Sequence, residues 1–252
     1  MLFDSHAHLD DEKFDTDRDE VIKSLKDEGL SYVVNIGADI KSSRNSVELA
    51  KKYDFIYASV GVHPHDAAEM RESDLCELEE LSKYEKVVAI GEIGLDYHYE
   101  NTDKEAQKFW FEKQLKLSQK LNLPFIVHDR DAHADTLEII KKVGYTNGVM
   151  HCFSGSAEMA REVVKMGMYV SLAGTVTFKN APKAQAVAES VPIDKLLIET
   201  DCPYLTPEPF RGKRNNPANV KYTAMKIAEL RGISYEELAE ITLNNAKKFY
   251  NI

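Results

Sequence analysis

The chain has 252 residues, of which 43% are hydrophobic and 29% are charged, and its formal net charge is −10. This composition is that of a globular protein with a sizeable core, and only 12 Gly and 8 Pro exclude collagen-like and low-complexity chains. The negative charge argues against a protein that coats duplex DNA through many Lys and Arg contacts to phosphate. It leaves room for a nucleic-acid substrate held by a local basic patch.

The cysteines and the N-terminal residues indicate the compartment. Cys76, Cys152 and Cys202 form an odd and sparse set, which is not a disulfide framework. The opening residues, MLFDSHAHLD, lack the basic start and the apolar stretch of a signal peptide. No apolar run approaches the ~20 residues that span a bilayer. We therefore expect a cytoplasmic protein without a membrane segment, and the sequence indicates no obligate protein partner.

Short apolar runs rich in β-forming residues recur along the whole chain. The runs are Leu2–Leu9, Ser31–Ile36, Phe55–Val62, Val87–Leu95, Pro124–His128, Gly148–Phe153, Met168–Leu172 and Leu196–Thr200. The segments between them carry the apolar spacing of helices, and six of these helices are predicted with bounds. The six are Asp15–Gly29, Asp103–Leu121, Ser156–Met166, Ala181–Val191, Pro217–Leu230 and Ser234–Tyr250. Alternation of buried-type strands with helices predicts a parallel sheet.

The number of strand–helix units decides between the two common parallel architectures. An open doubly wound sheet normally carries a Gly-rich phosphate loop, and the segment GEIGLD does not fit G-x-G-x-x-G. Eight units in a chain of this length predict an α/β fold of the (β/α)8 TIM-barrel type. Because no Gly/Ser linker, charge block or short repeat interrupts the chain, we interpret residues 1–252 as a single domain.

The histidines fall where such a barrel would hold its active site, at the C-terminal ends of the strands. Only His98 and His133 of the eight His lie elsewhere. Since alternate residues of a strand share a face, His6 and His8 point the same way. A single strand His is usually a hydrogen-bonded core residue, so the joint pattern carries the prediction. The predicted metal ligands are His6, His8, Glu92, His128, His151 and Asp201.

Six protein ligands exceed the three that one catalytic zinc takes and suit two divalent ions. His6, His8 and Asp201 are assigned to one ion and His128 and His151 to the other, with Glu92 as the bridge. The ions would lower the pKa of a bridging water, and Asp201 is the candidate general base. Imidazoles suit Zn²⁺ and Mn²⁺, whereas carboxylates and phosphate oxygens suit Mg²⁺.

Several motifs together resemble the TatD family of metal-dependent deoxyribonucleases. They are DSHAHLD, GVHPH, GEIGLDY, VHDRDA, HCFSGS and IETDCPYLTPEPFRGKRNNP, in this order from residue 4 to about residue 220. HxH alone is common among hydrolases, whereas GEIGLDY together with ETDCPYL and RGKRN is highly specific. The resemblance implies a metal-dependent hydrolase barrel related to the amidohydrolases. It also implies phosphodiester cleavage, often by a 3′-to-5′ exonuclease on single-stranded DNA or RNA.

The resemblance also bears on the metal site. The six predicted ligands fall on the metal-binding positions of the family, which is generally regarded as Mg²⁺-dependent. Related phosphotriesterase-like enzymes have a carboxylated Lys as the bridge. Glu92 stands at that place here, which favours the nuclease branch.

Other polar residues at strand ends are candidates for catalysis or for substrate binding. His63 is predicted to bind phosphate or protonate a leaving group, with an ordinary hydrogen-bonded His as the alternative. Glu199 shares the inward face of Asp201 and orients a metal ligand or a substrate hydroxyl, as such carboxylates do, or else is a buried acid paired with Arg130. Arg130 could instead clamp phosphate.

Residues beside the predicted ligands have simpler interpretations. Asp4 lies beneath His6 on the same strand face and is predicted to support it. Asp10 and Asp96 are interpreted as loop or helix-cap residues. Cys152 and Cys202 each neighbour a ligand, but strand alternation points them to the opposite face, where they would pack.

The segment Pro203–Pro217 follows the last strand and should overhang the site. Its cations are Arg211, Lys213 and Arg214. Such a cluster is usually a solvated loop, but beside a phosphodiesterase site it predicts phosphate binding. Tyr204 and Phe210 could stack on the bases of an unpaired strand.

Three functional hypotheses follow, and the leading one is a two-metal nuclease acting on single-stranded ends. The second is a hydrolase of a small ester, lactone or amide, or of D-aminoacyl-tRNA, that uses the same ions, because sites rather than folds decide chemistry. The third is a non-enzymatic metal-binding scaffold, against which the abundance of ligands argues.

Overall fold

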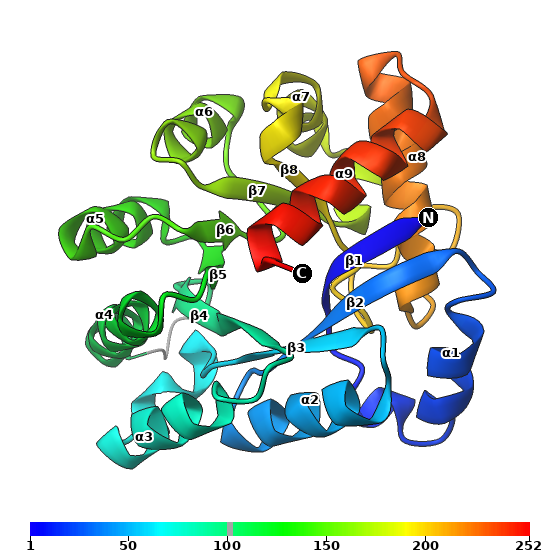
Figure 1. Cartoon of the computed structure of the whole chain (residues 1–252). Coiled ribbons are helices and arrows are strands. Elements are labelled where there is room, and N and C mark those ends of the chain that lie inside the picture. Colours follow the sequence, from blue (N-terminus) through cyan, green and yellow to red (C-terminus); the bar gives the residue numbers. More distant parts are fainter. Residues whose placement is uncertain (100–102) are drawn as a thin grey trace. The chain divides into compact units, whose positions relative to one another are not determined.

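The computed structural model describes residues 1–99 and 103–252 (Figure 1). All eight predicted strands are present, and they form one sheet in chain order. They are β1 (Leu2–Ala7), β2 (Leu30–Ile36), β3 (Ile56–Val60), β4 (Val87–Asp96), β5 (Phe125–Arg130), β6 (Gly148–Met150), β7 (Tyr169–Leu172) and β8 (Leu196–Ile198). The pairs β1–β2, β3–β4, β4–β5, β5–β6 and β7–β8 are parallel, as the alternation of strands and helices predicts.

Helices lie between the strands, and the six predicted ones are all found. The helices are α1 (Arg18–Ser24), α2 (Ile40–Lys52), α3 (Glu72–Leu81), α4 (Lys104–Leu121), α5 (His133–Val143), α6 (Ala157–Lys165), α7 (Pro182–Ser190), α8 (Val220–Arg231) and α9 (Tyr235–Tyr250). Capping explains the predicted starts, because the side chains of Asp103, Ser156 and Ser234 accept hydrogen bonds from the first turns of α4, α6 and α9.

Two predicted helices differ in detail. The segment predicted as a helix from Asp15 to Gly29 is helical only over α1. The helix predicted from Pro217 begins as a 3-10 turn, Pro217–Asn219, and continues as α8. Within the described ranges, none of the helices combines the length and the apolarity that a membrane span requires.

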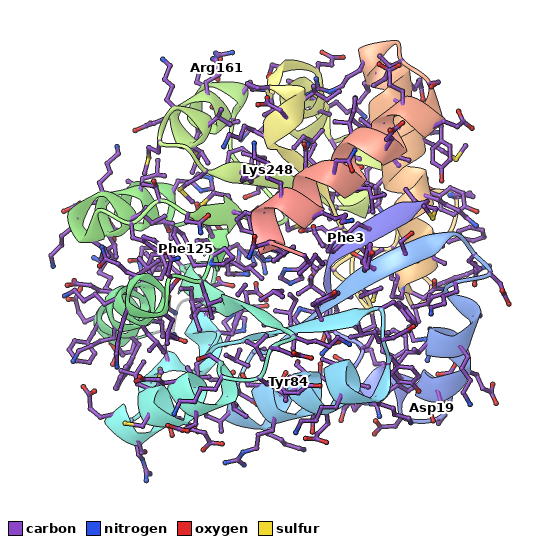
Figure 2. The ribbon with its side chains drawn as sticks, viewed as in Figure 1. Phe3, Asp19, Tyr84, Phe125, Arg161 and Lys248 are labelled. Atoms are coloured by element: carbon purple, nitrogen blue, oxygen red, sulfur yellow. The ribbon has the colours of Figure 1, made fainter. Side chains whose placement is uncertain are left out.

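The contacts of the chain divide it into two compact units. We call residues 1–35 with 152–252 the terminal unit, and residues 36–151 the central unit. The single-domain interpretation stays a prediction. Each unit has its own core, as the buried Phe3 and Phe125 illustrate, whereas Asp19, Arg161 and Lys248 are exposed (Figure 2).

In the terminal unit, α9 packs on β1 and β8. Phe3 of β1 stacks on Tyr250 of α9 with ring centroids 5.8 Å apart, and the Tyr250 hydroxyl donates to the Ser5 carbonyl at 2.8 Å. The last helix therefore anchors the strand that carries the HxH motif.

In the central unit, α2 packs on β3, and α4 packs on β4 and α5. Close approach of β4 and β5 depends on Gly94. A Cβ at this residue would lie 2.0 Å from the His128 carbonyl oxygen, and its φ is +144°. Glycine is therefore required here, because a side chain would push apart the strands that carry Glu92 and His128.

Candidate functional site

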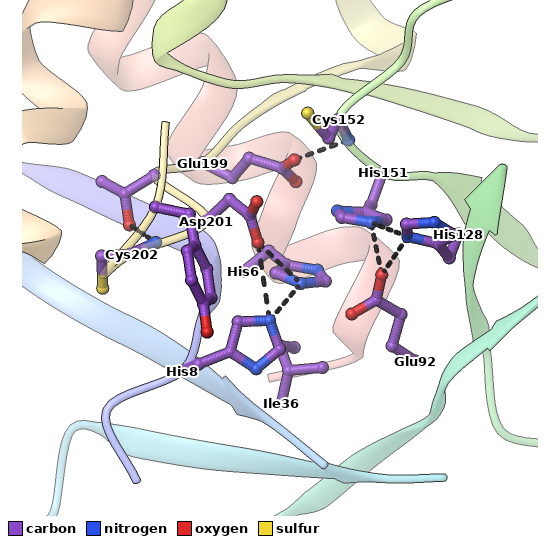
Figure 3. Close-up of polar contacts among 12 residues, drawn as sticks. His6, His8, Ile36, Glu92, His128, His151, Cys152, Glu199, Asp201 and Cys202 are labelled. Atoms are coloured by element: carbon purple, nitrogen blue, oxygen red, sulfur yellow. Dashed lines mark hydrogen bonds and ion pairs between the residues drawn. The ribbon is translucent and has the colours of Figure 1, made fainter. Parts of the chain in front are cut away.

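The terminal unit brings three predicted metal ligands together at the ends of β1 and β8 (Figure 3). The Nε2 atoms of His6 and His8 lie 3.2 Å apart. Oδ1 of Asp201 lies 3.6 Å from His6 Nε2 and 3.5 Å from His8 Nε2. These three donor atoms are the ones that the sequence assigned to one ion.

Backbone contacts between the two strand ends hold these ligands. The Asp201 N–H donates to the His6 carbonyl at 2.9 Å, and the His8 N–H donates to the Cys202 carbonyl at 2.8 Å. Asp201 has φ 55°, a left-handed conformation that Asp tolerates better than most residues do. The conformation turns the chain sharply after β8, at the residue predicted to be both ligand and base.

Asp4 supports this strand end, as predicted. Its fully buried carboxylate accepts hydrogen bonds from the Thr200 N–H and hydroxyl, at 2.9 and 2.5 Å, and from the His6 N–H at 3.3 Å. Burial raises the pKa of Asp4 well above its usual value, against the lowering effect of these donors. The carboxylate thus ties β1 to the end of β8.

Glu199 lies two residues before Asp201 and is nearly fully buried. Its Oε1 accepts a hydrogen bond from the Cys152 backbone N–H at 2.6 Å (Figure 3). Glu199 therefore fixes the loop that follows His151. Cys202 is buried, as the packing interpretation predicts, whereas Cys152 is half-buried.

Asn215 holds the loop after β8 through its side-chain amide, a role that no sequence motif predicts. The buried Asn215 amide donates to the carbonyls of Thr200 and Tyr204, at 3.0 and 2.7 Å. Tyr204 is 45% exposed, and its hydroxyl donates to Asp11 at 2.7 Å. Its ring lies 6.4 Å from that of His8, so an aromatic surface borders this group of ligands.

The three cations of this loop have different partners. Arg214 makes two hydrogen bonds to the Asp17 carboxylate, at 2.8 and 2.6 Å, which offset its charge. Arg211 lies over the ring of Phe178 at 4.2 Å. Lys213 lies 5.5 Å from the Phe210 ring. Arg211 and Lys213 thus remain the better placed of the three for a phosphate.

The central unit brings the other predicted ligands around one carboxylate oxygen (Figure 3). Oε1 of the buried Glu92 lies 2.6 Å from His151 Nε2 and 2.8 Å from His128 Nδ1. The His63 Nε2 atom lies 3.8 Å from the same oxygen. His63, Glu92 and His128 offer donor atoms that all lie within 4.8 Å of one another, a spacing at which they could hold an ion.

Asp96 fixes the orientation of His128. His128 Nε2 donates to Asp96 Oδ2 at 3.1 Å, and His65 Nε2 donates to the same oxygen at 2.9 Å. The interpretation of Asp96 as a loop or cap residue covers only part of its role: Oδ1 accepts a hydrogen bond from the His98 backbone N–H at 2.9 Å, whereas Oδ2 holds two histidines. Local sequence does not reveal the second role, because both histidines lie on other strand ends. With Nε2 occupied, His128 turns Nδ1 toward Glu92.

Hydrogen bonds between Asp96 and His128 shift the pKa values of both side chains. Burial by itself would raise the pKa of Asp96, but the hydrogen bonds from His128, His98 and His65 hold it well below its usual range. Burial would lower the pKa of His128, and the two carboxylates, Asp96 and Glu92, raise it above the usual value instead. The pKa of His63 falls well below its usual value through burial and the neighbouring His128.

Two buried glutamines of α4 position the strand ends. The Gln107 amide accepts from the Asp96 N–H at 2.9 Å and donates to the Asp96 carbonyl at 3.1 Å. The Gln114 amide does the same to Val62, at 2.8 and 3.0 Å. Because residues seven apart share a helix face, one helix holds both the carboxylate behind His128 and the residue before His63.

The donor sets of both units fit divalent metal ions. Each combines imidazole nitrogens with one carboxylate, which is the chemistry of Zn²⁺ and Mn²⁺ sites and, through the carboxylates, of Mg²⁺. In the central unit three imidazoles face a single buried carboxylate oxygen, and the donor atoms of His63, Glu92 and His128 are close enough together to hold one cation. In the terminal unit the three donor atoms lie within 3.6 Å of one another.

Known proteins are similar to this chain over nearly its full length. The family model of TatD related DNases matches residues 3–251. An uncharacterized metal-dependent hydrolase of Bacillus subtilis, YabD, is 52% identical over 254 residues, with 100% of both chains covered. The uncharacterized metal-dependent hydrolase YcfH of Escherichia coli K12 is 39% identical over 257 residues, covering 100% of this chain and 96% of YcfH.

A solved structure supports the fold. YjjV, a TatD homologue from Escherichia coli K12, superposes with a TM-score of 0.95 at 30% identity, covering 100% of this chain and 98% of YjjV. The predicted (β/α)8 barrel of alternating strands and helices is thereby confirmed. Together with the match over residues 3–251, this similarity shows that the chain belongs to the TatD family of metal-dependent hydrolases.

Proposed function

We propose that this TatD-family hydrolase cleaves phosphodiester bonds of nucleic acids and trims single-stranded DNA or RNA from the 3′ end. The observation that carries the proposal is a group of imidazole and carboxylate donors at the strand ends of each unit. It is supported by the description of the matching family as TatD related DNases. Three free cysteines suit a reducing compartment such as the cytoplasm.

The proposed roles follow the two groups of donors. His6, His8 and Asp201 would hold one divalent ion, and His128 and His151 would hold a second. That Glu92 bridges both ions stays a prediction. When bound, divalent ions of this kind supply Lewis-acid chemistry and lower the pKa of water.

The protein's own side chains complete the proposed reaction. Asp201 accepts the proton of the attacking water at its carboxylate, as general base. His63 hydrogen-bonds a phosphate oxygen or the leaving oxygen through its ring nitrogen. Glu199 acts through the Cys152 backbone by fixing the loop after His151.

Substrate binding is proposed for residues bordering these groups. In the terminal unit, Tyr204 offers a ring for base stacking, and Arg211 and Lys213 offer positive charge to phosphates. Arg214 lies in the same loop, but its bidentate contact with Asp17 gives it an anchoring role first. In the central unit, Arg130 ends β5 and is exposed.

The test is release of 5′-mononucleotides from a 3′-labelled single-stranded oligonucleotide. The protein is stripped of metal and reloaded with Mg²⁺, Mn²⁺ or Zn²⁺ in turn. We expect metal-dependent release that Glu92→Gln abolishes, because the substitution removes the charge that faces three imidazoles. Glu158→Gln, at an exposed pair with Arg161, is the matched control and should cleave normally.

The same variants are tested on duplex DNA, RNA, aminoacyl-tRNA and small neutral esters. Hydrolysis of the ester or of aminoacyl-tRNA without cleavage of any oligonucleotide would overturn the nuclease in favour of the second class of hydrolase. Binding of metal without turnover of any substrate would favour a scaffold.

A further inference from the structure

An exposed aromatic ring lies beyond the ligands of the central unit, and neither the motifs nor the roles proposed above include it. Tyr99, three residues after β4, is 52% exposed. The rings of His65 and His98 approach it edgewise, with centroids 5.3 and 5.1 Å away. The Arg130 guanidinium lies 5.7 Å from its centroid. Tyr99 is half exposed and has three basic side chains beside it, so its ring belongs to the surface rather than to the core. We call Tyr99 with His65, His98 and Arg130 the aromatic surface.

The Arg130 guanidinium is available to an anion. Within residues 1–99 and 103–252 it takes part in no hydrogen bond or ion pair. Arg214, by contrast, is held by Asp17. The carboxylate of Asp131, the residue after Arg130, lies 3.2 Å from His98 Nδ1 and so has a partner of its own. A guanidinium without a carboxylate partner is well suited to bind phosphate through two parallel hydrogen bonds.

The aromatic surface borders the proposed metal ligands directly. The His65 ring lies 5.3 Å from Tyr99 and 6.3 Å from the ring of His128. One imidazole therefore separates Tyr99 from a residue proposed to hold an ion. Tyr99 is therefore near enough for the neighbouring nucleotide of a strand whose phosphate reaches His128.

We infer that Tyr99 and Arg130 form a nucleotide subsite for a single-stranded substrate. The base stacks on the Tyr99 ring, and the adjoining phosphate binds the Arg130 guanidinium. The inference rests on the proposed function and adds where the strand lies beyond the bond that is cut. Because every base has a π-face, the subsite accepts any base but requires that one be present.

The test measures binding of a fluorescent single-stranded oligonucleotide to the metal-loaded full chain by anisotropy, with phosphorothioate links to slow cleavage. Tyr99→Ala should weaken binding roughly five-fold to 150-fold, which is the range for loss of one stacked base. Tyr99→Phe should bind like the wild type. Arg130→Gln should weaken binding and lower the slope of log affinity against log salt by about 0.7.

A matched control exists on α4. Phe109 is 50% exposed and has Lys113 at 5.2 Å from its ring, but it lies on a helix rather than at a strand end. Phe109→Ala should leave binding unchanged. An oligonucleotide with abasic positions should bind the wild type and Tyr99→Ala equally, because no base is left to stack.

The outcomes separate the subsite from the proposed function. Equal binding by wild type and Tyr99→Ala on normal oligonucleotides, or no binding by the wild type, overturns the subsite. Tyr99-dependent binding without any cleavage supports the subsite and contradicts the nuclease. Since Tyr99 is half exposed, thermal unfolding of Tyr99→Ala should match that of Phe109→Ala.

Discussion

Replacement of Asp96 by Asn tests whether this residue presents His128 to a metal ion. The two side chains have the same shape, but the amide has one oxygen and an NH₂ group that donates. Asp96 Oδ2 accepts from both His128 and His65, and Oδ1 accepts from the His98 N–H at 2.9 Å. Either orientation of the amide therefore places a donor against a donor.

The size of the effect follows from the lost contact. A hydrogen bond to a charged group is worth about 1.5–3 kcal/mol. With the NH₂ group at the Oδ2 position, the amide no longer holds the His128 ring through Nε2. With the oxygen there, an uncharged oxygen accepts more weakly than a carboxylate, and the NH₂ group opposes the His98 N–H. In both orientations Nδ1 of His128 is held toward Glu92 less firmly. Loss of a partner behind a ligating His typically costs roughly 10- to 100-fold in metal affinity. We expect Asp96→Asn to weaken metal binding at the donors of the central unit by that factor and to leave binding at His6, His8 and Asp201 unchanged.

The assay is competition of metal-stripped protein with a fluorescent chelator for Zn²⁺ or Mn²⁺. Asp131→Asn is the control, because Asp131 pairs with His98 at the surface and its φ of 57° suits Asn. Thermal stability is not the readout, since a neutral Asn also costs less to bury than Asp. Metal affinity in Asp96→Asn equal to that of the wild type would refute the positioning role.

Three further predictions concern the central unit. Gly94→Ala should lower both the thermal midpoint and metal binding, because its Cβ would meet the His128 carbonyl. Gly144→Ala, at φ +73° with open space around it, should cost only about 1–2 kcal/mol and leave metal binding unchanged. Gln114→Leu leaves the Val62 N–H and carbonyl unpaired, and each should lower the free energy of unfolding by about 1–3 kcal/mol, measured in denaturant. Gln119→Leu, on the exposed face of α4, is the control and should change this free energy little. Metal binding should release a proton from His128, whose pKa is raised above its usual value by Asp96 and Glu92. Affinity measured by chelator competition should thus rise with pH through that raised pKa and then level off, and an affinity independent of pH would contradict this.

Residue type and position along a strand predicted which imidazole and carboxylate groups come together at the strand ends, because a β-strand encodes its faces locally. His6 and His8 are two residues apart, so their common direction follows from alternation alone. The short contacts of Glu92 with His128 and His151 also agree with their places at strand ends. The bridging position of Glu92 and the identity of the ions stay predictions.

The partners of these side chains were not predictable in the same way. Asp96 has the sequence context of a cap, and Arg214 that of a free phosphate binder, yet each has its main partner far along the chain. Gln107 and Gln114 look like ordinary polar helix residues, and only packing of α4 shows them bound to strand backbone. Tyr99 carries no motif signal that separates it from other surface aromatics.

The sequence by itself determined the alternation of strands and helices, the class of fold and the residues predicted to hold metal, since these depend on spacing within single elements. Tertiary structure alone decided which nitrogen of His128 faces Glu92, which cations keep their charge and where an aromatic ring borders the proposed ligands. Those properties depend on hydrogen bonds and contacts between residues distant in sequence, which no local pattern records.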